Sequence, residues 1–160
     1  ARRHLNDWRK GFERAGNDAN GSITAFYTVL AEDEDNSDPV AEEVRSILDG
    51  HIVLSRELAQ RGQYAAVDIA ASLSRVMNAI VSPDLQRLAR EFRALSANYE
   101  ANRDLVLMGA YRAGADPQLD RAIAMHAALT SFLCQDAAET IAIEQSFLEL
   151  AALLHPEAAH

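Results

Sequence analysis

The second half of the chain carries an apolar spacing that fits a helix and does not fit a strand. After Pro83, apolar side chains recur at steps of three and four residues, which places them on one face of an α-helix. The residues with this spacing are Leu85, Leu88, Phe92, Leu95, Tyr99 and Leu105. The pattern predicts a long helix from Asp84 onward that buries this face.

Two further helices are expected to follow. Gly109 and Gly114 bracket a break in the spacing, and Asp116-Pro117 has the N-cap residue and first-turn proline that begin helices. The expected helices run from Asp116 to about Leu133 and from about Ala137 to Leu154. Residues 84–160 are therefore expected to form an all-α helical bundle.

The first half has mixed α/β character. Ser22 to Ala31 is rich in β-branched and aromatic residues and is apolar on both faces, which is typical of a strand buried inside an α/β sheet. Turn residues, Asn17 to Gly21, precede it. Asp38-Pro39 begins a helix that is expected to end near Leu48, with Gly50 as its stop.

Three more segments are expected before Pro83. His51 to Ser55 has the pattern of a second buried strand, and a short helix is expected from Arg56 to Gly62. Tyr64 to Ile69 is expected to lead into a helix that contains Ser72 to Met77. The fold class that these patterns predict is α/β followed by all-α.

The charge balance restricts the partners. The chain has 15 Lys and Arg residues against 24 Asp and Glu, a net charge of −9. Nucleic-acid binders need a basic face for phosphates, so this class is disfavoured. No apolar run approaches the roughly 18 residues of a membrane span, and the first residues lack the apolar core of a signal peptide, so the cytoplasm is the expected compartment.

Several residues have a simple structural interpretation. Residues 1–14 combine basic residues with Trp8 and Phe12, which fits an amphipathic or foreign leader over residues 1–11 better than a helix that touches a membrane. The acidic run from Glu32 to Asp35 with Asp38 lacks the spacing of a calcium loop and is interpreted as solvated. The five histidines show no metal-binding pair, and Cys134 is expected to be a small buried apolar residue.

The lysine content excludes one kind of nucleotide site. The only lysine is Lys10, in the stretch WRKGF, with no preceding glycines and no following Ser or Thr. A phosphate-binding loop needs GxxxxGK[ST], because backbone N–H groups and the lysine share the phosphate charge. The chain therefore cannot bind the phosphates of a nucleotide through such a loop of its own.

A long stretch of the first half carries a family resemblance. The stretch from Gly21 to Met77 contains the segments GSITAFYTVL, SILDGHIVLSR and SRVM. It resembles the catalytic core of the ATPases that drive type III protein export. These are homo-hexameric relatives of the rotary ATP synthase β subunit. In the second half, NRDLV and GAYRAGADPQLDRAI are similar to the flagellar branch more than to the virulence-injectisome branch. The resemblance covers roughly residues 12 to 154.

The resemblance implies a fold and a reaction. Residues 12–83 would be the C-terminal part of a RecA-like (F1-type) nucleotide domain, and residues 84–160 the helical C-terminal domain. The family's phosphate loop and Walker B aspartate lie upstream of the matching segment. ATP and Mg²⁺ are therefore implied for a full-length parent, and no cofactor is expected for this chain alone.

The resemblance also implies roles for individual residues. Arg75 stands at the arginine finger, which would act on the nucleotide of the neighbouring subunit, although an ion pair with an acidic neighbour such as Asp68 is the structural alternative. Tyr64 matches the aromatic residue that stacks on adenine. The turn with Gly109, Tyr111, Arg112 and Asp116 corresponds to the loop that faces the central stalk, although an ordinary helix–helix connection fits it equally well.

The implied partners follow from the same resemblance. They are a homo-hexamer, a central stalk protein, a regulatory subunit, export chaperone–substrate complexes and the export gate at the inner membrane, with no nucleic acid. The implied function is delivery of unfolded proteins for export, driven by ATP hydrolysis in the cytoplasm at the membrane. The alternatives are an injectisome ATPase and a truncated, non-catalytic module that binds export partners.

Overall fold

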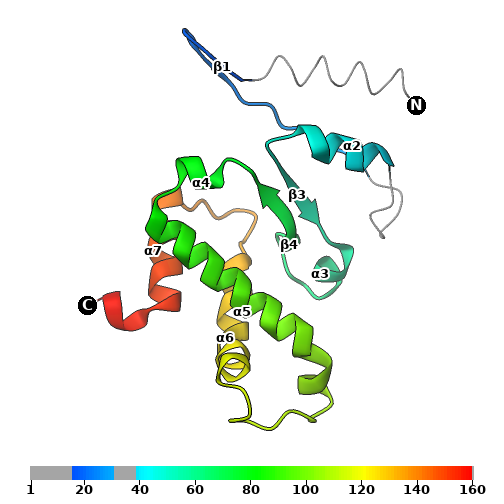
Figure 1. The fold of residues 1–160 in the computed structure, drawn as a ribbon, viewed down its shortest axis with the longest axis vertical. Helices are drawn as coiled ribbons and strands as arrows, with labels where there is room; N and C mark the ends of the chain where they lie inside the picture. The colour runs from blue at the N-terminus through cyan, green and yellow to red at the C-terminus, as the bar shows by residue number, and fades with distance from the viewer. Residues whose placement is uncertain (1–15, 31–38, 160) are drawn as a thin grey trace. The chain divides into compact units, whose positions relative to one another are not determined.

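A computed structural model describes residues 16–30 and 39–159 of the chain (Figure 1). The chain divides into two units, Ala1–His51 and Ile52–His160. The expected leader over residues 1–11 and the acidic run with Asp38 lie outside the described residues.

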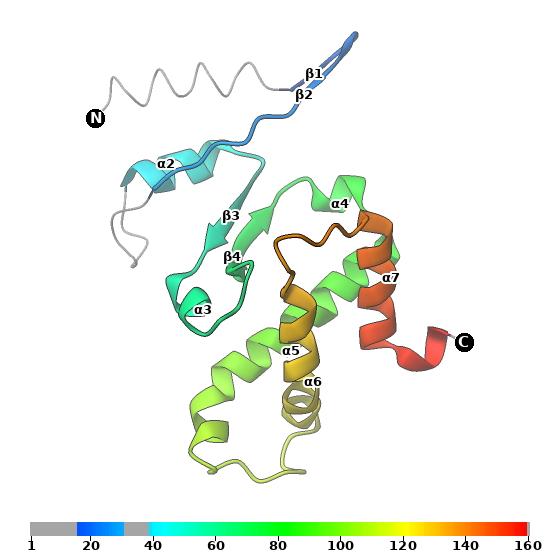
Figure 2. The ribbon, with the colours of Figure 1, turned by 180° about the vertical axis from the view of Figure 1, so that it is seen from behind.

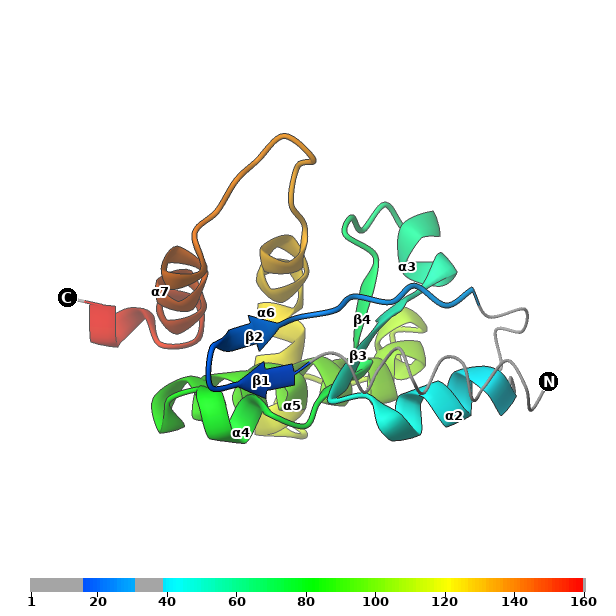
Figure 3. The ribbon, with the colours of Figure 1, turned by 90° about the horizontal axis from the view of Figure 1, so that it is seen from above.

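The first unit contains a small hairpin. Strands β1 (Gly16–Asp18) and β2 (Gly21–Ile23) pair antiparallel, with Gly16 opposite Ile23 (Figure 3). The Asp18 carboxylate accepts the backbone N–H of Asn20 at 2.6 Å and of Gly21 at 3.0 Å, as an aspartate does when it closes a turn. The turn expected between Asn17 and Gly21 is confirmed.

The buried strand expected from Ser22 to Ala31 is wrong. β2 ends at Ile23, residues 24–30 have no regular secondary structure, and Phe26 and Leu30 are each 90% exposed. A strand buried on both faces needs strands beside it and helices over it. Among the described residues β2 pairs only with β1, so the apolar side chains that follow it stay exposed.

Helix α2 (Pro39–Ile47) ends close to the expected residue. Ala41 and Val44, three residues apart, are buried, and an exposed ion pair joins Arg45 to Glu42 at 2.7 Å. Strand β3 (Gly50–Leu54) begins three residues after the helix ends, so Gly50 opens the strand and does not merely stop the helix.

A two-stranded sheet begins the second unit. β3 pairs with β4 (Val67–Ser74), and the short helix α3 (Arg56–Gln60) lies in the segment that connects the two strands (Figure 2). Ser55 caps α3 by accepting the N–H of Leu58 at 3.3 Å, and Gly62 follows the helix at φ +80°, a conformation that favours glycine. The short helix is confirmed.

Two expectations for this sheet are wrong. The strand at His51 exists but is not buried, because Ile52 and Leu54 are 69% and 71% exposed. The segment from Ser72 to Ser74 is the end of β4 and not a helix, and helix α4 (Met77–Ile80) begins only afterwards. Pairing with β3 outweighs the weak local helix preference of a serine-rich segment.

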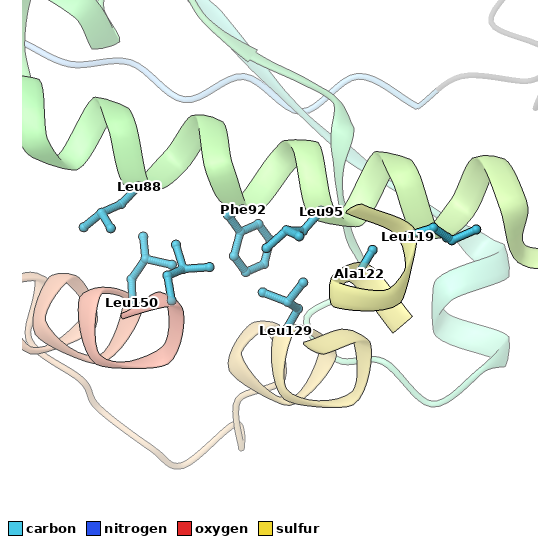
Figure 4. Close-up of a cluster of buried hydrophobic side chains, with 8 residues drawn as sticks. Leu88, Phe92, Leu95, Leu119, Ala122, Leu129 and Leu150 are labelled. Carbon is cyan, nitrogen blue, oxygen red and sulfur yellow. The ribbon is translucent and has the colours of Figure 1, made fainter. Parts of the chain in front are cut away.

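Three helices form the core of the second unit. They are α5 (Pro83–Leu107), α6 (Pro117–Leu133) and α7 (Ile143–Leu154), and a 3₁₀ turn, η1 (Pro156–Ala159), follows. Leu88, Phe92 and Leu95 point from α5 toward α6 and α7 (Figure 4). The buried residues that they meet are Leu119, Ala122 and Leu129 of α6 and Leu150 and Leu154 of α7. The predicted apolar face of the long helix is therefore confirmed from Leu85 to Tyr99, whereas Leu105, expected on the same face, is 43% exposed.

Local capping explains where the helices begin. Ser82 accepts the N–H of Leu85 at 3.3 Å, and Asp116 accepts those of Gln118 at 2.8 Å and Leu119 at 3.3 Å. The last helix begins at Ile143 and not near Ala137, because the Asp136 carboxylate accepts the N–H of Ala138 at 2.9 Å and forms a turn there. Across residues 16–30 and 39–159, no helix is both long and apolar enough to cross a membrane.

Candidate functional site

Tyr64 lies in the turn between α3 and β4 and is 61% exposed. The turn is closed by local backbone bonds, from Gln63 N–H to the Leu58 carbonyl at 3.0 Å and from Val67 N–H to the Ala65 carbonyl at 2.8 Å. The backbone is thus fixed while the ring faces solvent. An exposed aromatic ring on a fixed turn can stack on a planar ligand.

Arg75 lies at the bend between β4 and α4 and is exposed. Asp68, the acidic neighbour considered as its ion-pair partner, uses its carboxylate to accept the backbone N–H groups of Ala70 and Ala71, both at 2.9 Å. Arg75 stands where the chain leaves the strand. This location suits contact with a group outside the chain.

The structure does not bring Tyr64 and Arg75 together. They flank opposite ends of β4, which has 8 residues. At about 3.3 Å per residue such a strand is about 25 Å long, so the two side chains cannot serve the same small region of one ligand.

The turn between α5 and α6 is organised around Tyr111. Its hydroxyl lies 3.0 Å from the Asp116 carbonyl and 3.0 Å from the Asp120 carboxylate, and it accepts the Asp116 N–H at 3.2 Å. The other carboxylate oxygen of Asp120 accepts the Gly114 N–H at 2.9 Å. Desolvation, together with the Asp120 hydrogen bond and the nearby negative charges, raises the pKa of Tyr111 above 10.0. The tyrosine therefore stays neutral and available for these bonds.

The four residues singled out in this turn fall into two groups. Tyr111 and Asp116 use polar atoms to shape the turn, and Gly109, at φ +67°, lets the chain leave α5. Arg112 is exposed, and it lies close in sequence to Leu107 and Met108, which are 64% and 74% exposed. The outward-facing part of the turn therefore includes apolar residues that the sequence did not single out.

One backbone contact that the sequence did not predict reaches the Tyr64 turn. The N–H of Gln135, just after α6 ends, donates to the Tyr64 carbonyl at 2.9 Å. No short-range spacing could reveal this contact, because it joins segments that are distant in sequence. It ties the turn to the end of a core helix.

A carboxylate joins the three core helices. Glu91 of α5 accepts from Arg121 of α6 at 2.5 Å and contacts His155, just after α7, at 2.9 Å. Arg121 also donates to the Leu154 carbonyl at 3.4 Å. Burial alone would raise the pKa of Glu91, but hydrogen bonds and positive charge from Arg121 and His155 outweigh it and hold this pKa below 4.5.

A second polar cluster lies between α5 and α6. The His126 ring stacks on Tyr99, with centroids 3.5 Å apart and planes 9° apart. Burial lowers the pKa of His126 below 6.5, and Arg103 and Arg61 act in the same direction while Glu100 opposes them. The imidazole is therefore held mainly neutral against the tyrosine ring near pH 7.

Two other expectations concern cysteine and metals. Cys134 is exposed, not buried, because α6 ends at Leu133 and the cysteine begins the following loop. Within the part of the chain that the structure describes, no group of three or more His, Cys, Asp or Glu side chains could hold a metal ion.

Two protein families match consecutive parts of the chain. Residues 5–74 match the nucleotide-binding domain of the ATP synthase alpha/beta family, and residues 81–152 match the C-terminal domain of the type III secretion ATPase EscN. The order, a short α/β part followed by a helical part, is the fold class that the sequence predicted.

Relatives of similar identity come from both export systems. The chain is 53% identical over 138 residues to a type 3 secretion system ATPase of Xanthomonas euvesicatoria, covering 86% of this chain and 31% of that protein. It is 50% identical over 140 residues to the flagellum-specific ATP synthase of Salmonella typhimurium, again covering 86% of this chain and 31% of that protein. The chain thus spans about a third of the length of these relatives.

Solved structures agree with the sequence matches. The assembled ATPase EscN of the enteropathogenic E. coli type III secretion system matches 94% of this chain and 36% of that chain, with a TM-score of 0.90 and 41% identity. EscN in complex with its central stalk EscO matches with a TM-score of 0.84 and 39% identity, covering 94% and 35%. The chain belongs to the flagellar and type III secretion ATPases, relatives of the ATP synthase alpha/beta family, and corresponds to their C-terminal portion.

Proposed function

We propose that the chain is the C-terminal part of a flagellum-specific ATPase that couples ATP hydrolysis to delivery of unfolded proteins for export. Residues 12–83 would complete a RecA-like nucleotide domain, and residues 84–160 would form the helical domain. The observation that carries the proposal is the placement of exposed Tyr64 and exposed Arg75 at opposite ends of β4. In a ring of identical subunits, one chain could then contact two different nucleotides.

Arg75 is proposed to act in trans. Its guanidinium would reach the γ-phosphate bound by the neighbouring subunit and neutralise the charge that develops as the phosphoryl group transfers. Its exposed position at the end of β4 supports this role, because a contact across a subunit boundary requires a side chain that faces outward.

Tyr64 is proposed to stack on the adenine of the nucleotide held by its own subunit. Tyr64 is 61% exposed and its backbone is held by hydrogen bonds, which supports stacking at a small entropic cost. ATP and Mg²⁺ would be held mainly by the upstream phosphate loop of the parent. This chain alone is therefore expected neither to hydrolyse ATP nor to bind Mg-ATP tightly, and micromolar binding by calorimetry would contradict that expectation.

The turn after α5 is proposed to contact the central stalk of the export apparatus. EscN, a relative, is solved in complex with its central stalk EscO. Leu107, Met108 and Arg112 supply exposed apolar and cationic groups, and Tyr111 with Asp116 would hold the turn in shape. Other proposed partners are a homo-hexamer, a regulatory subunit, chaperone–substrate complexes and the export gate, at the cytoplasmic side of the inner membrane.

The flagellar assignment rests on the sequence segments NRDLV and GAYRAGADPQLDRAI. Relatives from both branches have similar sequence identity to the chain. The test is complementation with the full-length gene that contains this segment. We expect it to restore motility to a strain without its flagellar ATPase, and a phosphate-loop lysine variant should not. Restored injectisome secretion without motility would favour the injectisome alternative. If neither is restored and no upstream GxxxxGK[ST] is encoded, the chain is a non-catalytic module that binds export partners.

A further inference from the structure

The Tyr64 turn is held from the helical part of the second unit as well as by its own local bonds. The backbone N–H of Gln135 donates to the Tyr64 carbonyl at 2.9 Å. Gln135 follows α6 directly, whereas Tyr64 lies between α3 and β4. A movement of the end of α6 would therefore act on the peptide group of Tyr64.

Gln135 is itself held in place. Its side-chain Nε2 donates to the Glu139 carbonyl at 3.0 Å, and the Glu139 N–H returns to the Asp136 carbonyl at 3.0 Å. Just before it, Phe132 packs against Phe92 of α5, with ring centroids 5.9 Å apart. These contacts fix the position of the Gln135 amide relative to the helical core.

A second contact lies at the start of the same turn. The Arg61 guanidinium is 3.9 Å from the Glu100 carboxylate of α5 and also pairs with Glu57. An exposed pair at this distance contributes little alone, so the Gln135 bond is the main connection. The two contacts nevertheless attach both sides of the turn to the helical part.

We infer that Gln135 is a positioning residue for nucleotide binding: its backbone N–H holds the Tyr64 peptide and so sets the Tyr64 ring for the base. The inference rests on the proposed role of Tyr64. In this inference Gln135 acts through the Tyr64 peptide and not by contact with the nucleotide. Because the bond joins α6 to the base-stacking residue, a partner that shifts α6 would change the affinity for the base without touching the phosphates.

The test removes the N–H in the full-length ATPase that contains this segment. Gln135→Pro lacks the donor, and the preceding residue, Cys134, already has φ −89° and ψ 134°, the region that a residue before proline adopts. Gln135→Ala is the matched control, because it keeps the N–H and loses only the bond to the Glu139 carbonyl. Thermal melting of each variant reports whether the fold is kept.

Calorimetry would compare binding of ATP with binding of inorganic tripolyphosphate, which has no base. We expect Gln135→Pro to weaken ATP about three- to tenfold, the effect of one hydrogen bond, and to leave tripolyphosphate unchanged. Gln135→Ala should bind both like the wild type. Equal weakening of both ligands, or no weakening of ATP by the folded proline variant, would overturn the inference.

Tyr64→Ala separates the inference from the proposed function. If it weakens ATP but Gln135→Pro does not, Tyr64 keeps its role and the inference fails. If Tyr64→Ala leaves ATP binding unchanged, the stacking role itself fails. Should the proline variant not fold, hydrogen exchange in the wild type decides the matter: slower exchange of the Gln135 amide with ATP than with tripolyphosphate supports the inference, and equal exchange overturns it.

Discussion

At the scale of single residues, Arg75 is the position on which the proposed chemistry depends. In the full-length ATPase, Arg75→Ala should reduce the rate of hydrolysis about a thousandfold and leave ATP affinity nearly unchanged. The guanidinium meets charge that builds up during phosphoryl transfer, so it stabilises the transition state more than bound ATP. Steady-state hydrolysis and equilibrium binding of a non-hydrolysable analogue measure the two effects separately.

Two controls test whether Arg75 acts across the subunit boundary. Arg75→Lys should rescue poorly, because lysine lacks the planar fork of arginine. Mixed rings of Arg75→Ala subunits and subunits with a defective phosphate loop should recover some activity, since some interfaces then pair an intact finger with an intact loop. Mixed rings that form but stay inactive would leave Arg75 a structural role only.

His126 should make the stability of the chain depend on pH. Its pKa is lowered by burial, so below the ordinary value of 6.5 the unfolded chain binds more protons than the folded chain. The stability that His126 contributes is therefore complete above about pH 6.5 and is lost as the pH falls through the lowered value. Urea midpoints measured from about pH 7.5 to pH 5 should fall for the wild type.

His126→Phe is the matched variant for this measurement. Phenylalanine keeps a ring against Tyr99 but carries no titrating group. Its urea midpoint should fall less over the same pH range. Titration of Glu91 is common to both proteins, so parallel curves would mean that His126 does not cause the dependence.

At the scale of elements, the helix starts show what local sequence can predict. Asp116-Pro117 and the apolar spacing after Pro83 specified α6 and α5 because caps and periodic burial are local signals. β4 was missed because its strand conformation depends on pairing with β3. The Tyr64–Gln135 and Glu91–His155 contacts were missed because they form only after distant segments have packed. The positions of Tyr64 and Arg75 were available only through family resemblance, not through spacing.

The starts of α6 and α7 also give a matched stability prediction. Asp116→Ala removes the acceptor for Gln118 and Leu119 and should destabilise the chain by about 1 kcal/mol. Ala142 stands at the N-cap of α7 with an extended backbone and no side-chain cap, so Ala142→Asp should stabilise by up to about 1 kcal/mol. Urea unfolding measures both, and changes of the same sign would contradict the capping argument.

At the scale of the whole molecule, the helical core should be more stable than the segments whose apolar residues are exposed. The three-helix core buries its leucines and Phe92, whereas Phe26, Leu30, Ile52 and Leu54 are exposed. Residues 82–159 alone should therefore fold as a helical monomer, and the whole chain should self-associate through exposed apolar residues and strand edges. Circular dichroism and sedimentation test the two forms.

Hydrogen exchange provides the complementary measurement on the whole chain. Backbone amides of residues 24–30 should exchange much faster than those of α5 and α6, because that segment has no regular secondary structure. A monomer in which residues 24–30 are better protected than the helices would show that this segment is covered in a way that the described structure lacks.

The placement of Tyr64 and Arg75 at opposite ends of β4 has a consequence for a ring that contains one defective copy. If Tyr64 at one end serves the chain's own nucleotide and Arg75 at the other serves its neighbour's, every copy is half of two reaction centres. A copy without a phosphate loop would then have an inactive centre of its own, but its Arg75 would still complete the centre of its neighbour. Loss of Arg75 would instead leave the copy's own centre intact and inactivate the centre of one neighbour. The position of the inactive centre would therefore show which part of the copy was defective.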